Sequence, residues 1–151
     1  MAKKKEWYMD YATHAFVKYA ELGRPTREEQ IAAIRSRVNR ELSLHEPSFI
    51  VIRADAEVAN AEPLLKDIDA VNRVFKILEE QDKPGIADAI KAVYFIDPRG
   101  KPKRGAIVAR ARRFAYEYPA NERTVYKWLK SARLLFAIER GLCTGKDDER
   151  W

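Results

Sequence analysis

Cysteine and histidine are scarce in this chain of 151 residues, which contains only Cys143, His14 and His45. A single cysteine cannot form an intramolecular disulfide, and this favours a reducing cytoplasm over secretion. A structural zinc site usually needs about four Cys or His ligands at short spacing. The three side chains here are far apart in the sequence, so we expect no metal site and no cofactor.

Long apolar runs are also absent. The lysine-rich start resembles the first part of a signal peptide, but Trp7, Tyr8, Asp10 and His14 interrupt what would have to be its apolar segment. No run approaches the roughly 18 apolar residues that a transmembrane helix requires. We therefore expect a soluble, cytoplasmic protein that does not bind membranes.

The sequence has no glycine-rich phosphate loop and no nucleophile motif. Its close carboxylate groups are Glu79–Glu80, the pair Asp67 and Asp69, and the group at 147–149. Asp67 and Asp69 would point about 200° apart on a helix, so they do not converge on one substrate. The 147–149 group lies in a polar tail, where chain ends usually fray. We expect that the protein is not an enzyme.

Charge is distributed unevenly around a net value of +6. Residues 41–98 contain six Lys or Arg and twelve Asp or Glu, a net charge of −6. Residues 101–140 contain eleven Lys or Arg and three Glu, a net charge of +8. A basic segment beside an acidic body is typical of proteins that bind a polyanion such as DNA.

Apolar residues recur at helical spacing along most of the chain, which predicts an all-α fold. Gly23 should end the first helix, and Thr26 with Glu29 forms a capping box that should begin the second. We expect these two helices to pair as an antiparallel hairpin over residues 1–44. The other expected helices cover about Pro63 to Leu78, Ile86 to Phe95, Ala106 to Tyr116, and Glu122 to Arg140.

The segment 45–62 does not show the same spacing. Its run Phe49-Ile50-Val51-Ile52 has the composition of a strand, yet no second convincing strand is present. We interpret the segment as an apolar linker packed on the body; the alternative is an edge that pairs between chains. The remaining expected units are a helical DNA-binding domain at 63–142, with a helix-turn-helix at about 106–140, and a polar tail at 143–151.

The last predicted helix has two contrasting faces. Asn121 is a good N-cap residue. At about 100° per residue, Leu129, Ala132 and Phe136 fall within about 40° of Val125, and the four residues form an apolar stripe. Arg123, Lys127 and Lys130 fall on the opposite side, with hydroxyl-bearing and basic residues at its edges, namely Thr124, Tyr126, Ser131 and Arg133. A helix in the major groove needs such an apolar anchor and such outward donors. Leu134 also falls on the polar side, so the DNA-facing part should end near Arg133, and protein should cover the helix beyond it.

The stretch 121–133, Asn-Glu-Arg-Thr-Val-Tyr-Lys-Trp-Leu-Lys-Ser-Ala-Arg, resembles the recognition-helix pattern of sigma-factor region four. Phe114, Ala115 and Tyr118 match the preceding helix of that pattern. The same arrangement occurs in small phage and prophage regulators of the RinA/ArpU type, and the resemblance covers about 86–142. The sequence departs from the pattern at Pro119, where a turn glycine is usual, at Arg113, where an acidic residue is common, and at Trp128, which is bulkier than usual.

The resemblance implies a transcriptional regulator of phage or prophage late genes that binds specific double-stranded DNA. Arg123, Lys127 and Lys130 would face bases and nearby phosphates, and Thr124, Tyr126 and Arg133 would support the register. The remaining predicted contacts, to backbone phosphates, are Arg110, Arg112, Arg113, Lys101, Lys103 and Arg104. Candidate protein partners are RNA polymerase and a second copy of the chain. The alternatives are a DNA-packaging adaptor like a terminase small subunit, and a sigma-like factor.

Overall fold

A computed structural model describes residues 7–95, 106–118 and 120–143 of the chain. The described residues form helices and no strands, which confirms the predicted all-α class. In chain order the helices are α1 (Trp7–Glu21), α2 (Arg27–Glu41), α3 (Pro47–Asn60), α4 (Glu62–Glu80), α5 (Pro84–Tyr94), α6 (Ala106–Glu117) and α7 (Glu122–Arg140).

The helices α1, α4, α5, α6 and α7 form the body, around one apolar core. Phe16 of α1 and Phe136 of α7 are completely buried at its centre. The Phe16 ring stacks on Tyr94 of α5 with centroids 5.6 Å apart, and it lies at the same distance from the Phe136 ring. Such large aromatic side chains contribute much of a core's burial, so these contacts join the first helix to the last.

A polar contact at the edge of the core joins three helices of the body. The Tyr11 hydroxyl of α1 donates to Asp67 Oδ1 of α4 at 2.8 Å, and Arg140 Nε of α7 donates to the same oxygen at 2.7 Å. The Arg140 and Asp67 side chains are each only 17% exposed, so solvent screens this ion pair less than a surface pair. Burial raises the pKa of Tyr11, and the hydrogen bond from its hydroxyl to Asp67 raises it further.

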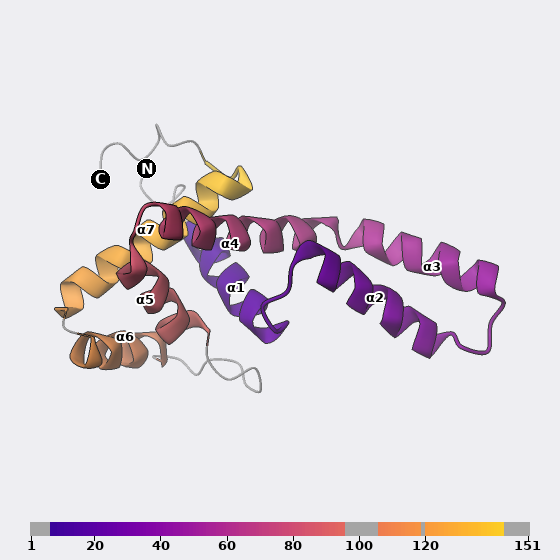
Figure 1. The fold of residues 1–151 in the computed structure, drawn as a ribbon, viewed down its shortest axis with the longest axis horizontal. Coiled ribbons are helices and arrows are strands. Elements are labelled where there is room, and N and C mark those ends of the chain that lie inside the picture. The colour runs from indigo at the N-terminus through magenta and orange to yellow at the C-terminus, as the bar shows by residue number, and fades with distance from the viewer. Residues whose placement is uncertain (1–6, 96–105, 119, 144–151) are drawn as a thin grey trace.

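Helices α2 and α3 form an arm that projects from the body (Figure 1). They pack on each other around a small separate cluster in which Ile34, Val38 and Ala54 are buried. Ion pairs join the two helices along the arm, with Arg35 Nη1 at 2.7 Å from Asp55 Oδ1 and Arg37 Nη2 at 2.8 Å from Glu57 Oε2.

The arm corrects two expectations. Residues 45–62 are not a linker packed on the body, because they form α3, with Pro47 in its first turn. The predicted pairing of the first two helices is also wrong, since α1 packs on α4, α5 and α7 while α2 packs on α3 and α4. The physical reason is burial: the large apolar side chains of α1, among them Tyr8, Phe16 and Tyr19, are buried against the helices of the body.

The predicted start of α2 is confirmed in detail. Glu29 N–H donates to Thr26 Oγ1 at 3.1 Å, and Thr26 N–H donates to Glu29 Oε1 at 3.0 Å, which completes the capping box. Gly23 ends the turn after α1 with a φ of 86°, a left-handed conformation that glycine adopts without steric cost. These two local signals set the point at which the chain leaves the body and enters the arm.

Candidate nucleic-acid interface

Helix α6 and the first half of α7 lie beside α5 at the end of the body away from the arm, and the second half of α7 runs back toward α1 and α4 (Figure 1). Asn121 begins α7, because its Oδ1 accepts the Thr124 N–H at 2.8 Å, as its N-cap assignment predicted. Gly141 ends α7 in the left-handed conformation, with a φ of 81°. The ends of α7 are therefore fixed by local interactions that the sequence specifies.

The predicted apolar stripe of α7 is confirmed. All four of its members are nearly or completely inaccessible to solvent, namely Val125, Leu129, Ala132 and Phe136. These residues anchor α7 in the body along almost its whole length. The opposite side of its first half is therefore held in a fixed orientation.

The outward side of the first half of α7 is cationic. Arg123, Lys127 and Lys130 are exposed, as is Tyr126, whereas Thr124 is half-buried. The three cations follow one another at spacings of four and three residues, which places them on one side of the helix. We call Arg123, Lys127 and Lys130 the cationic face. These three side chains can donate hydrogen bonds to an anionic partner and attract it by their positive charge, without disturbing the core.

Helix α6 adds two exposed cations and one structural arginine. Arg112 and Arg113 are exposed, at 70% and 81% of their side chains, and form surface ion pairs with Glu122 at 3.1 Å and Glu117 at 3.0 Å. Such exposed pairs are worth at most about 1 kcal/mol, so a phosphate could displace the glutamates. By contrast, half-buried Arg110 donates through Nη1 to the Val93 carbonyl at 3.1 Å and ties α6 to α5. The predicted contacts Lys101, Lys103 and Arg104 lie outside the described residues.

Arg133 is separated from the cationic face by burial. The residue is half-buried, and its Nε is buried with no hydrogen-bond partner among the described residues. Burial raises the pKa of the Tyr94 hydroxyl, and the positive charge of Arg133 lowers it by a smaller amount. The structure thus places Arg133 between α7 and the body, where it has less access to a ligand than Lys127 or Lys130.

The second half of α7 is covered by α1. Leu134 packs with Tyr8 and Met9 of α1, and Ala137 is completely buried in the same cluster. This confirms the prediction that protein covers α7 beyond Arg133. The outward cations of α7 therefore stop where the contact with α1 begins.

A close contact between α5 and α7 was not predicted from the sequence. Gly85 lies in the first turn of α5, and a Cβ atom built there would be 2.9 Å from Cη2 of Trp128 in α7. The Trp128 ring also contacts Tyr118 edge to face, at 5.8 Å between centroids. The bulk of Trp128, which departs from the sigma pattern, is therefore accommodated by the missing side chain of Gly85.

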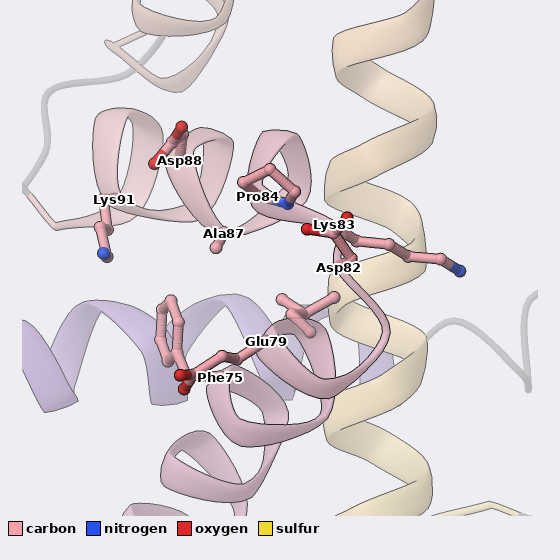
Figure 2. A pocket seen from close by; sticks show the side chains of 9 residues that line it. Phe75, Glu79, Asp82, Lys83, Pro84, Ala87, Asp88 and Lys91 are labelled. Carbon is pink, nitrogen blue, oxygen red and sulfur yellow. The ribbon is translucent and has the colours of Figure 1, made fainter.

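The body also has a shallow cavity of about 350 Å³ between α4 and α5 (Figure 2). Lys91 Nζ lies over the Phe75 ring, 5.7 Å from its centroid, while the Lys83 side chain extends away from both. Acidic and basic side chains mix around the opening, namely Glu79, Asp82, Lys83, Asp88 and Lys91. This cavity shares no residue with the cationic face, and its mixed charges do not select a ligand of one sign.

Neither a metal site nor a membrane-spanning helix is found in the part of the chain that the structure describes. No group of three or more His, Cys, Asp or Glu side chains is placed to hold a metal ion there. None of the described helices combines the length and the apolar character needed to cross a bilayer. In comparisons with protein-family models, curated proteins and solved structures, nothing matches the chain.

Proposed function

We propose that the chain is a sequence-specific DNA-binding protein that inserts the first half of α7 into the major groove. The observation that carries the proposal is the cationic face, which lies opposite a buried apolar anchor on the same helix. An α-helix with its side chains is about 10–12 Å wide, which fits a major groove of about 12 Å. Arg123, Lys127 and Lys130 would contact base edges and nearby phosphates.

The surroundings of the cationic face suit a phosphate backbone. Arg112 and Arg113 on α6 would contact phosphates beside the groove once they leave their surface glutamates. Thr124 and Tyr126 lie at the edges of the face and would support the register. Arg110 would act indirectly, by holding α6 against α5.

The resemblance of residues 121–133 to sigma region four supports a role in transcription, and we propose regulation of phage or prophage late genes. One feature of the body supports this role: α7 is packed against α1, α4, α5 and α6. A rigidly held recognition helix reads bases with less loss of conformational entropy than a mobile one.

The first experiment is selection of binding sites from a random pool of duplex DNA, followed by fluorescence anisotropy on an enriched site at several salt concentrations. The variant is Lys127→Ala with Lys130→Ala. It should weaken binding and reduce the slope of log K against log salt by up to about 2, because each phosphate contact contributes about 0.9. Contacts of these lysines with bases instead of phosphates would weaken binding with a smaller change of slope.

A matched control removes two other exposed cations, Arg40→Ala with Lys66→Ala, on α2 and α4. It changes the net charge by the same amount and should leave affinity and slope close to those of the wild-type chain. The proposal is wrong if the random pool yields no enriched sequence, or if the control and the α7 variant weaken binding equally.

A further inference from the structure

Helix α3 has two apolar faces, and the body and α2 cover only one of them. The inner face packs on α2 and α4 through Ile50, Ala54 and Val58. On the other side, Phe49 is 47% exposed and Ile52 is 68% exposed. Large apolar side chains that remain exposed together on one helix usually mark a surface for a partner.

The exposed face follows the spacing of a coiled-coil seam. Its members recur at intervals of three, four and three residues and fall within about 80° on a helical wheel, as the a and d positions of two heptads do. We call these residues the outer stripe: Phe49, Ile52, Ala56 and Ala59. The nearest wheel positions on either side are the uncharged Ser48 and Asn60, and one exposed residue of each sign, Arg53 and Asp55, lies about 20° beyond them. The outer stripe is therefore suited to another helix and not to a charged ligand.

The order of side chains along the outer stripe fits a second copy of itself. Large residues stand at the start of α3 and small ones at its end. In an antiparallel pair, Phe49 of one copy would lie opposite Ala59 of the second copy, and Ile52 opposite Ala56. Large side chains facing small ones fill the space between two helices without voids or overlap.

The net charge of the arm permits two copies of the chain to approach each other at the outer stripe. Residues 27–60 contain five Arg and six Asp or Glu, a net charge of −1, whereas the rest of the chain has a net charge of +7. Two of these arginines already pair within the arm, Arg35 with Asp55 and Arg37 with Glu41 and Glu57. Two copies that meet through their arms thus avoid the mutual repulsion of their basic regions, and an arm of this charge does not attract a polyanion.

We propose that the outer stripe is a self-association surface, through which two copies of the chain pair with their α3 helices antiparallel. The contact is two-fold symmetric, as in most protein dimers. The two arms then form a four-helix arrangement that covers the apolar face α2 leaves open. This inference goes beyond DNA binding and does not depend on it.

Analytical ultracentrifugation of the full chain without DNA tests the proposal, over concentrations from about 1 to 100 µM that bracket micromolar association. The variant is Phe49→Ser with Ile52→Ser. Symmetry removes each apolar side chain twice, so the dissociation constant of the dimer should rise on the order of 100-fold or more. The matched control is Val51→Ser, on the same helix and 56% exposed but outside the outer stripe, and it should dimerise like the wild-type chain.

Circular dichroism of each variant shows whether the arm remains helical, and Ala59→Glu provides a second variant that puts a charge at the small end of the stripe. Loss of dimer in both stripe variants, with retention in the Val51 control, supports the proposal. A wild-type chain that stays monomeric throughout the range overturns it, even if the stripe binds another protein. Undiminished dimerisation of both stripe variants overturns it as well.

Discussion

The contact between Gly85 and Trp128 gives a quantitative test of how α7 is held. In Gly85→Ala, the new Cβ would lie 2.9 Å from Cη2 and 3.2 Å from Cζ2 and Cζ3 of the indole. Carbon atoms prefer a separation of about 3.5–4.0 Å, so the ring or the helix must shift. Because Tyr118 packs against the same ring, the indole has little room to move.

Two opposing effects set the magnitude. Overpacking of this kind costs about 1–3 kcal/mol. Replacing glycine by alanine within a helix gains roughly 0.5–1 kcal/mol. The expected net loss for Gly85→Ala is therefore up to about 2.5 kcal/mol in the free energy of unfolding, equivalent to several degrees in the melting temperature of a chain of this size.

Urea denaturation followed by far-ultraviolet circular dichroism measures this loss without relying on tryptophan fluorescence. The decisive comparison is a double-mutant cycle with Trp128→Phe, which removes the atoms that the new Cβ would meet. In that background Gly85→Ala should be neutral or stabilising. Equal destabilisation in both backgrounds, or a stabilising effect in the wild-type chain, would refute the idea that the indole fixes the distance between α5 and α7.

Two further predictions concern the start of α7 and the root of the arm. Asn121→Ala should lower the free energy of unfolding by about 1 kcal/mol, because α7 loses its N-cap. Asn121→Asp should keep most of the wild-type stability, because aspartate is also a good N-cap residue. Equal thermal stability of the wild-type chain and both variants would contradict the role of the cap. Arg27, which pairs with Glu62 at 2.9 Å, lowers the pKa of that carboxyl below its ordinary value of 4.5. The stabilisation is therefore present above pH 4.5 and is lost as the pH falls through the lower value in the folded state. In urea unfolding, Glu62→Gln should lose less stability between neutral pH and about pH 3 than the wild-type chain loses. An equal loss in both chains would argue against the contribution of this pair.

Local signals in the sequence predicted most of the helices and the organisation of α7. The capping box at Thr26 and the N-cap at Asn121 each specify a helix start through bonds between near neighbours, so no knowledge of the fold is needed. The buried stripe from Val125 to Phe136 was equally predictable, because an anchored helix must repeat its apolar residues at helical spacing.

Helix α3 was missed because its composition and its spacing disagree. The β-branched run at 50–52 favours a strand, whereas Ile50, Ala54 and Val58 lie four residues apart and contact α2 as a helix. Burial against α2 outweighs the weak intrinsic preference of these residues. Pro47, which begins α3, was the local signal that could have identified it.

Contacts between distant parts of the chain were not predictable in the same way. Nothing local to Phe16 specifies that it packs on Tyr94 and Phe136 instead of on α2. The candidate site shows the same limit: the wheel placed Arg133 at the edge of the cationic face, but the bulk of the body leaves it half-buried. Burial by neighbours remote in sequence decides which cations remain accessible.

The separation of buried and exposed positions on α7 determines which of its residues can be substituted without loss of stability. The buried positions that anchor the helix are separate from the outward positions Arg123, Tyr126, Lys127 and Lys130. Substitutions restricted to those four sites would alter the outward chemistry of α7 at little cost to folding, since exposed positions usually tolerate exchange within about 0.5 kcal/mol. A library built on them would therefore present many different recognition surfaces on one unchanged scaffold.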